Sequence, residues 1–166
     1  MSDRILIDPA EFAEQKLQLQ GSVFLRDLDV RVHSGAIADT DAEIAYTLQG
    51  GKDRWQRPFL DLSVSGSLKL CCQRCLKPMD FDLDEEAHIV MFRDEAALDK
   101  AMLADENLDG IVLEPELEVF YLLEDQVLMG IPFAPTHEHC DSELSAQSGS
   151  DKPNPFAVLA GLKKAD

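Results

Sequence analysis

The alternation of apolar and polar side chains is most regular in the middle of the chain. From Leu60 to Leu70 one face is apolar, while the intervening positions are mostly serine, with an aspartate and a lysine. A period of two is typical of a β-strand with one buried face. A second such segment runs from Met79 to about Phe92 after a short turn, which predicts an antiparallel hairpin. Residues 42–48 alternate as well and predict a strand, and the Gly50-Gly51 pair predicts a turn after it.

Helix signals flank these strands. Near the N-terminus, Asp8 stands where an N-cap is expected, directly before Pro9, and the pattern predicts a helix that stops at Gly21. After the strands, Pro115 precedes an apolar stripe of helical period that Gly130 ends. The predicted helices therefore cover residues 8–20, 94–103 and 116–129.

Together these elements predict one α+β domain over residues 1–140. Its antiparallel β-sheet is either open or curled toward a barrel, carries a C-x2-C hairpin, and is packed by two or three helices. Residues 141–153 are polar and predict a linker. Residues 154–166 predict a short C-terminal helix at the end of a flexible tail.

Composition and charge narrow the class of protein. The chain has 166 residues, 45% of them apolar, which is enough to bury a core. It has no apolar run of about 18 residues and no signal-peptide pattern, so we expect a cytoplasmic protein without a membrane partner. The net charge of −17 is unevenly spread: residues 52–77 carry +4, and residues 78–144 carry −17. An acidic body repels nucleic acid and attracts basic proteins.

The cysteines and histidines are the candidate metal ligands. Cys72 and Cys75 form the C-x2-C turn, and Cys140 with either His137 or His139 follows the last helix. Three cysteines and one histidine are a common ligand set for structural zinc. Free thiols in a tight hairpin remain the alternative at this point. A redox role for the C-x2-C would call for a thioredoxin-like βαβ setting, which the pattern lacks.

Catalytic motifs are missing from the sequence. It contains no G-x-S-x-G, no G-x-x-x-x-G-K and no H-E-x-x-H. Glu124 and Asp125 are adjacent on the predicted 116–129 helix, so their side chains point about 100° apart. That spacing favours solvated or capping roles over a paired-carboxylate site, and we expect no catalytic residue.

Three segments resemble one known family. They are the hairpin Cys72-Gln73-Arg74-Cys75-Leu76-Lys77-Pro78, the acidic helix leading to Ile131-Pro132-Phe133-Ala134-Pro135-Thr136-His137, and the tail Lys152-Pro153-Asn154-Pro155-Phe156-Ala157-Val158-Leu159-Ala160. In this order they resemble the YceD family, the large ribosomal RNA subunit accumulation proteins. The resemblance implies a role in the synthesis, processing or stability of 23S ribosomal RNA. It supplies no catalytic residue and no small-molecule substrate.

The resemblance leaves two binding routes open. In the first, Lys69, Arg74 and Lys77 bind the phosphates of large-subunit precursor rRNA. In the second, which the net charge slightly favours, the acidic segment 78–144, with Glu124 and Asp125, holds a basic ribosomal protein. Phe156 in the tail is a candidate docking anchor. The alternative is that the tail helix folds back and covers apolar surface of the domain itself. The alternatives from other classes are a metal-assisted RNA-processing enzyme and a thiol redox sensor built on the C-x2-C.

Overall fold

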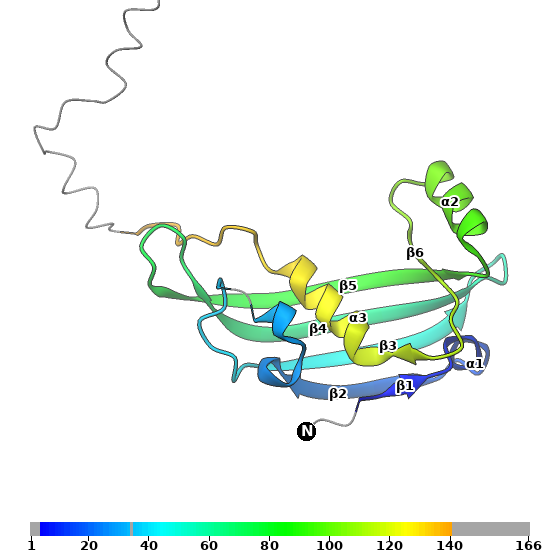
Figure 1. The fold of residues 1–166 in the computed structure, drawn as a ribbon, viewed down its shortest axis with the longest axis horizontal. Coiled ribbons are helices and arrows are strands. Elements are labelled where there is room, and N and C mark those ends of the chain that lie inside the picture. The colour runs from blue at the N-terminus through cyan, green and yellow to red at the C-terminus, as the bar shows by residue number, and fades with distance from the viewer. Residues whose placement is uncertain (1–3, 34, 141–166) are drawn as a thin grey trace, which may run out of the picture.

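The computed structural model describes residues 4–33 and 35–140, and a five-stranded sheet is its main element. The strands lie in the order β2-β3-β4-β5-β6, which is also their order along the chain (Figure 1). Their bounds are β2 Gln18–Phe24, β3 Glu43–Lys52, β4 Pro58–Cys71, β5 Pro78–Phe92 and β6 Asp109–Val112. The turn predicted at Gly50-Gly51 is wrong, because both glycines pair with β4 and the chain turns after Lys52. A separate two-stranded sheet pairs β1 (Leu6–Ile7) with β7 (Leu117–Glu118).

The β4–β5 hairpin that the alternation predicts is confirmed. The two strands are antiparallel, and their register places Leu62 opposite Ala87 and Leu68 opposite Phe81. Leu62, Val64, Leu68 and Leu70 are almost completely buried, whereas Ser65, Ser67 and Lys69 are exposed. The sheet therefore has an inner face that forms the core and an outer face that is polar.

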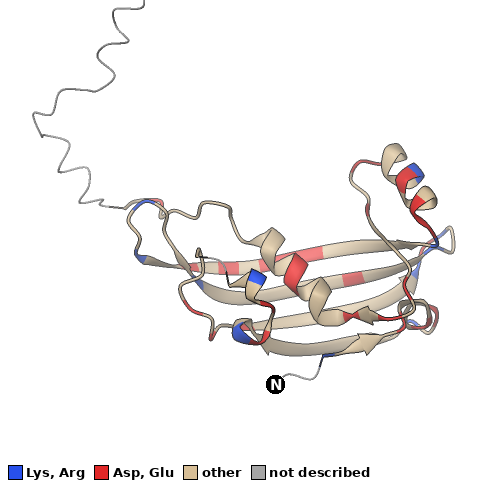
Figure 2. Ribbon diagram, viewed as in Figure 1, with Lys and Arg blue, Asp and Glu red and all other residues tan. Residues whose placement is uncertain are grey.

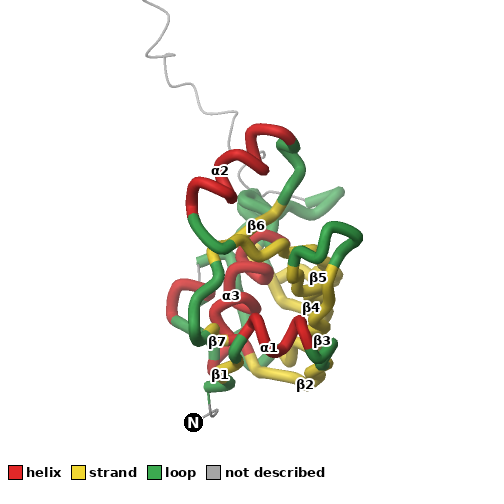
Figure 3. Tube along the Cα trace, turned by 90° about the vertical axis from the view of Figure 1, so that its right-hand side faces the viewer, coloured by secondary structure: helices red, strands yellow, loops and turns green. Residues whose placement is uncertain are grey.

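Helices cover the inner face. Helix α1 (Pro9–Glu14) packs on β3, and α3 (Val119–Gly130) crosses β4 and β5 on the same side (Figures 1 and 3). The buried side of α3 includes Val119, Leu123 and Val127. Helix α2 (Glu95–Ala104) contacts β6 at the sheet edge and has no buried residue. The predicted α+β class is thus confirmed, and no described helix has the length and apolarity needed to cross a membrane.

The N-terminal prediction is wrong beyond Glu14. Asp8 caps α1 through the N–H of Glu11, as expected, but the helix ends after six residues and Lys16 takes a positive φ of 51°. The chain then enters β2, which pairs with the edge of β3 over seven residues. A helix to Gln20 would leave that strand edge unpaired, so sheet pairing overrides the local helix signal.

The sheet is open and not barrel-like, and it is not purely antiparallel. Its edge strands are β2 and β6, and β6 runs parallel to β5. The reason is the connection: after Phe92 the chain turns back through α2, so β6 runs in the same direction as the last four residues of β5, with which it pairs. The predicted linker 141–153 and C-terminal helix 154–166, including Phe156, lie outside the described residues.

Candidate functional site

The turn between β4 and β5 is held tightly by its own backbone. The N–H of Cys72 donates to the carbonyl of Lys77 at 2.9 Å, and the N–H of Leu76 donates to the carbonyl of Cys72 at 2.8 Å. Leu76 takes a positive φ of 60°, which closes the turn. The turn thus places Cys72 in the protein interior and Cys75 at the half-buried rim.

A second segment meets this turn from across the sequence. After α3, residues 131–140 run toward the β4–β5 hairpin, and both lie together at one end of the molecule (Figure 1). The N–H of Gln73 donates to the carbonyl of Pro135 at 2.8 Å. Pro132 and Pro135 keep this segment extended. The contact brings His137 and Cys140 to the C-x2-C turn.

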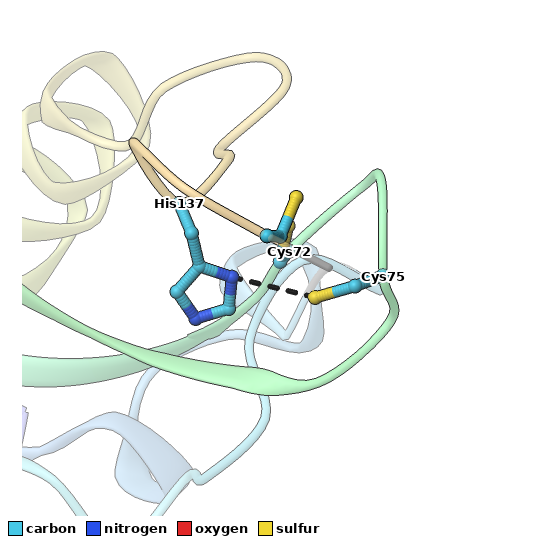
Figure 4. Close-up of side chains that lie close together, drawn as sticks. Cys72, Cys75 and His137 are labelled. Carbon is cyan, nitrogen blue, oxygen red and sulfur yellow. Dashed lines mark hydrogen bonds between the residues drawn. The ribbon is translucent and has the colours of Figure 1, made fainter. Parts of the chain in front are cut away.

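Four side chains converge there. The sulfurs of Cys72, Cys75 and Cys140 and one ring nitrogen of His137 all lie within 4.8 Å of one another. Cys75 Sγ and His137 Nδ1 are 3.4 Å apart (Figure 4). His139 is not one of the four; it lines the adjoining hollow of about 220 Å³. The structure therefore selects His137 from the two histidines that the sequence left open.

The surroundings of the sulfurs favour a thiolate at Cys72. Burial opposes its ionisation, but the backbone N–H groups of Cys75, His137 and Arg74 and the side chain of Cys75 outweigh burial and lower the pKa of Cys72 to about 5. The Arg74 N–H lies 3.4 Å from the sulfur. Burial and the nearby Cys72 raise the pKa of Cys140. Four soft or borderline donors in this geometry could bind a metal ion.

The outer face of the sheet carries a second notable feature, a column of acids along β5. Asp80, Asp82, Asp84 and Glu86 alternate on this face, all exposed, and acidic positions recur along the strand in Figure 2. Asp61 of β4 lies opposite His88, beside a shallow hollow of about 570 Å³. We call Asp61, Asp80, Asp82, Asp84 and Glu86 the acidic face. The alternation of acids at 80–86 is the sequence signal that would have found it.

Comparison with known proteins decides the family. The model of the family described as large ribosomal RNA subunit accumulation protein YceD matches residues 60–163. The chain belongs to the YceD family. A curated relative from Haemophilus influenzae, named large ribosomal RNA subunit accumulation protein YceD, is 29% identical over 96% of this chain and 95% of its own length. No solved structure matches the chain significantly. The family description names accumulation of an RNA, and no reaction.

In this YceD-family chain the basic residues of segment 52–77 do not form one patch. Arg74 and Lys77 are exposed at the tip of the β4–β5 hairpin, but Lys69 is paired with Asp80. The other basic residues of segment 52–77 lie at the β3–β4 turn, at the opposite end of β4 (Figure 2). A 14-residue strand separates the two turns by roughly 45 Å. The positive charge of this segment is therefore split between two ends of the molecule.

Glu124 and Asp125 also occupy unlike environments. The Glu124 side chain is only 7% exposed, so of the two roles expected for this residue, solvated or capping, burial excludes the solvated one. It accepts hydrogen bonds from the Asp29 N–H at 2.8 Å and from the guanidinium of Arg31 at 2.9 Å. Arg31 also pairs with the half-exposed Asp125 at 2.7 Å. Sequence reasoning missed Arg31, because no local pattern links it to a helix more than 90 positions away.

Proposed function

We propose that this chain is a non-catalytic ribosome assembly factor that supports 23S rRNA accumulation by binding a basic ribosomal protein. Membership of the YceD family and the name of the Haemophilus influenzae relative support the ribosomal role. The acidic face supports the choice of partner, and it is the single observation on which the mechanism rests. This role belongs to the cytoplasm, where ribosomes are assembled.

The chemistry of the outer face suits a cationic polypeptide. Its acidic side chains are flanked by hydroxyls of Ser63, Ser65 and Ser67, which can accept hydrogen bonds from lysine and arginine. Asp82, Asp84 and Glu86 take part in none of the ion pairs formed within residues 4–33 and 35–140. Their negative charge is therefore available to attract a cation and to speed the encounter with a basic partner.

Direct binding to RNA is the weaker alternative. At the hairpin tip only Arg74 and Lys77 are basic and exposed, and the acidic column of β5 begins directly behind them. Two cations supply few phosphate contacts, and the remaining charge of the chain opposes the approach of a polyanion. The RNA is therefore reached through the carried protein in this proposal.

A metal-assisted enzyme is also weaker. A catalytic zinc keeps one coordination position open for water, and three protein ligands are usual there. Here four protein side chains converge on one point, so any ion that they hold has its tetrahedral positions filled. Such an arrangement favours a structural role over hydrolysis.

The test is a pull-down of the tagged full chain from its own growing cells, with and without nuclease. In the acidic-face variant, Asp82→Lys, Asp84→Lys and Glu86→Lys are combined. The control reverses three exposed acids elsewhere, Asp99→Lys, Glu106→Lys and Glu114→Lys, and has the same net charge. Wild type and control should retain one basic ribosomal protein after nuclease treatment, and the acidic-face variant should lose it.

The opposite results point to a different mechanism. Recovery that nuclease abolishes, and that Arg74→Glu with Lys77→Glu removes, would establish direct RNA binding. Equal losses in both triple variants would mean that net charge alone attracts the partner. Precursor RNA cleaved by the purified chain would revive the enzyme alternative.

A further inference from the structure

We propose that Cys72, Cys75, His137 and Cys140 bind one Zn²⁺ in a closed tetrahedral site that fastens residues 131–140 to the β4–β5 hairpin. Such an ion would fix the architecture of the end of the molecule where the β4–β5 hairpin and residues 131–140 meet. Its binding does not depend on which ribosomal partner the acidic face binds.

The spacing of the donor atoms fits zinc. With Zn–S about 2.3 Å and Zn–N about 2.0 Å, neighbouring ligand atoms of a tetrahedral site are about 3.5–3.8 Å apart. Cys75 Sγ and His137 Nδ1 are already 3.4 Å apart, and the widest pair in the group is within 4.8 Å. An ion therefore needs to draw the donors together by no more than about 1 Å, which small rotations of the three half-buried side chains can supply.

The backbone already holds the ligands in place. The Arg74 N–H points at Cys72 Sγ, as amides of a C-x2-C turn do toward a metal-bound sulfur. The hydrogen bond from Gln73 to Pro135 fixes the two ligand-bearing segments side by side. Such outer contacts orient the donors before the ion arrives and lower the entropy lost on binding.

The donor set favours zinc over hard cations. Three sulfurs and one imidazole are too soft for magnesium or calcium, which prefer carboxylate and carbonyl oxygens. Three thiolates with one Zn²⁺ leave a single negative charge, and the guanidinium of Arg74 lies close enough to act electrostatically on Cys140. The site thus needs no further ligand from outside.

A thiolate–imidazolium pair of Cys75 and His137, or a disulfide between Cys72 and Cys75, accounts for less of the geometry. Either involves two residues, and neither gives a reason for the presence of Cys140 in the same group. A single ion contacts all four side chains. It also explains why residues 65 positions apart, Cys75 and Cys140, converge at the end of the hairpin.

Metal content of the full chain tests the site directly. Protein purified under reducing conditions should hold one zinc per chain by elemental analysis, and metal-free protein should take up one equivalent of added Zn²⁺. Cys75→Ser and His137→Ala should each lower the retained zinc to less than about a tenth. Their matched controls are Cys71→Ser and His139→Ala, which change the neighbouring cysteine and histidine and should keep one equivalent.

A second measurement separates metal loss from unfolding. Removing the zinc with a chelator should speed hydrogen exchange at residues 72–77 and 135–140 and leave the amides of β3 and β4 protected. Co²⁺ in place of zinc should give the ligand-field bands of a tetrahedral site with thiolate-to-metal charge transfer.

Three results would overturn the proposal. They are full chain that neither retains nor takes up zinc, equal loss in the Cys71→Ser control, and a Cys72–Cys75 disulfide trapped in cells. None of these would change the pull-down of a basic partner through the acidic face, so a failure here is distinct from a failure of the proposed function.

Discussion

The two faces of the β4–β5 hairpin differ completely, although alternate residues of the same two strands form them. On the inner face, Leu68 and Leu70 are fully buried, and α3 packs over the same side of the sheet. On the outer face, Ser67 and the residues Asp82, Asp84 and Glu86 of β5 are exposed. The inner face contributes the stability of the fold through burial of apolar surface. The outer face is left free to carry charge, and thereby to bind.

The largest effect should come from the inner face. Leu68→Ala removes a side chain with no exposed surface from the centre of the core and leaves a cavity. We expect a loss of about 3 kcal/mol in the free energy of unfolding, measured by urea denaturation. Ser67→Ala, at the neighbouring position on the outer face, should change that free energy by less than about 0.5 kcal/mol. Similar losses in both variants would mean that the two faces do not divide stability in this way.

A smaller loss in the free energy of unfolding should follow when the contact between Glu124 and Arg31 is broken. Glu124→Gln removes the charge that pairs with Arg31 and keeps the size of the side chain. Because the acceptor is almost fully buried, we expect destabilisation by about 2 kcal/mol in thermal or urea unfolding. Asp125→Asn removes the half-exposed partner of the same arginine and should have a much smaller effect. Equal destabilisation by the two variants would mean that the more exposed Arg31–Asp125 pair contributes as much to stability as the buried Arg31–Glu124 pair.

The smallest effect should be a gain in stability, produced by removing charge from the outer face. Asp82 and Asp84 point the same way on β5 about 7 Å apart, which is within the screening length at physiological salt. Asp82→Asn with Asp84→Asn should slightly raise the thermal midpoint at low salt, and high salt should remove the difference. Asp80→Asn should give no gain, because it also removes the pair with Lys69. A clear fall in the midpoint of the double variant would show that these acids are stabilising contacts.

Local sequence predicted the hairpin well and the N-terminus poorly, for one physical reason. In β4 and β5 the alternation agrees with the pairing, so propensity and tertiary structure favour the same conformation. Between Lys16 and Gln20 the two preferences conflict: the helix cap upstream favours a helix, whereas the edge of β3 gains hydrogen bonds only if this segment forms a strand. The sheet prevails because seven residues of ladder hydrogen bonds outweigh a few weak helix preferences.

The sequence predicted which residues could be ligands of the candidate metal site, but not how they are arranged in space. The spacing of Cys72 and Cys75 already indicated two ligands, and the proline-rich segment before His137 indicated a rigid approach. Which histidine faces the sulfurs depends on the hydrogen bond from Gln73 to Pro135, which no local pattern reveals. The buried contact of Glu124 with Arg31 was missed for the same reason.

The sequence by itself determined which side of each long strand is buried, because side chains alternate with a period of two along any strand. It also determined the available chemistry: an acidic body, three cysteines with either of two histidines as candidate metal ligands, and the segments typical of the YceD family. Only the tertiary structure decided which distant groups meet. The long strand β4 places the basic residues of segment 52–77 at opposite ends of the open sheet. The chain after α3 brings His137 and Cys140 to Cys72 and Cys75. Both results have one reason: contacts on a long sheet depend on positions in space and not on distance along the chain.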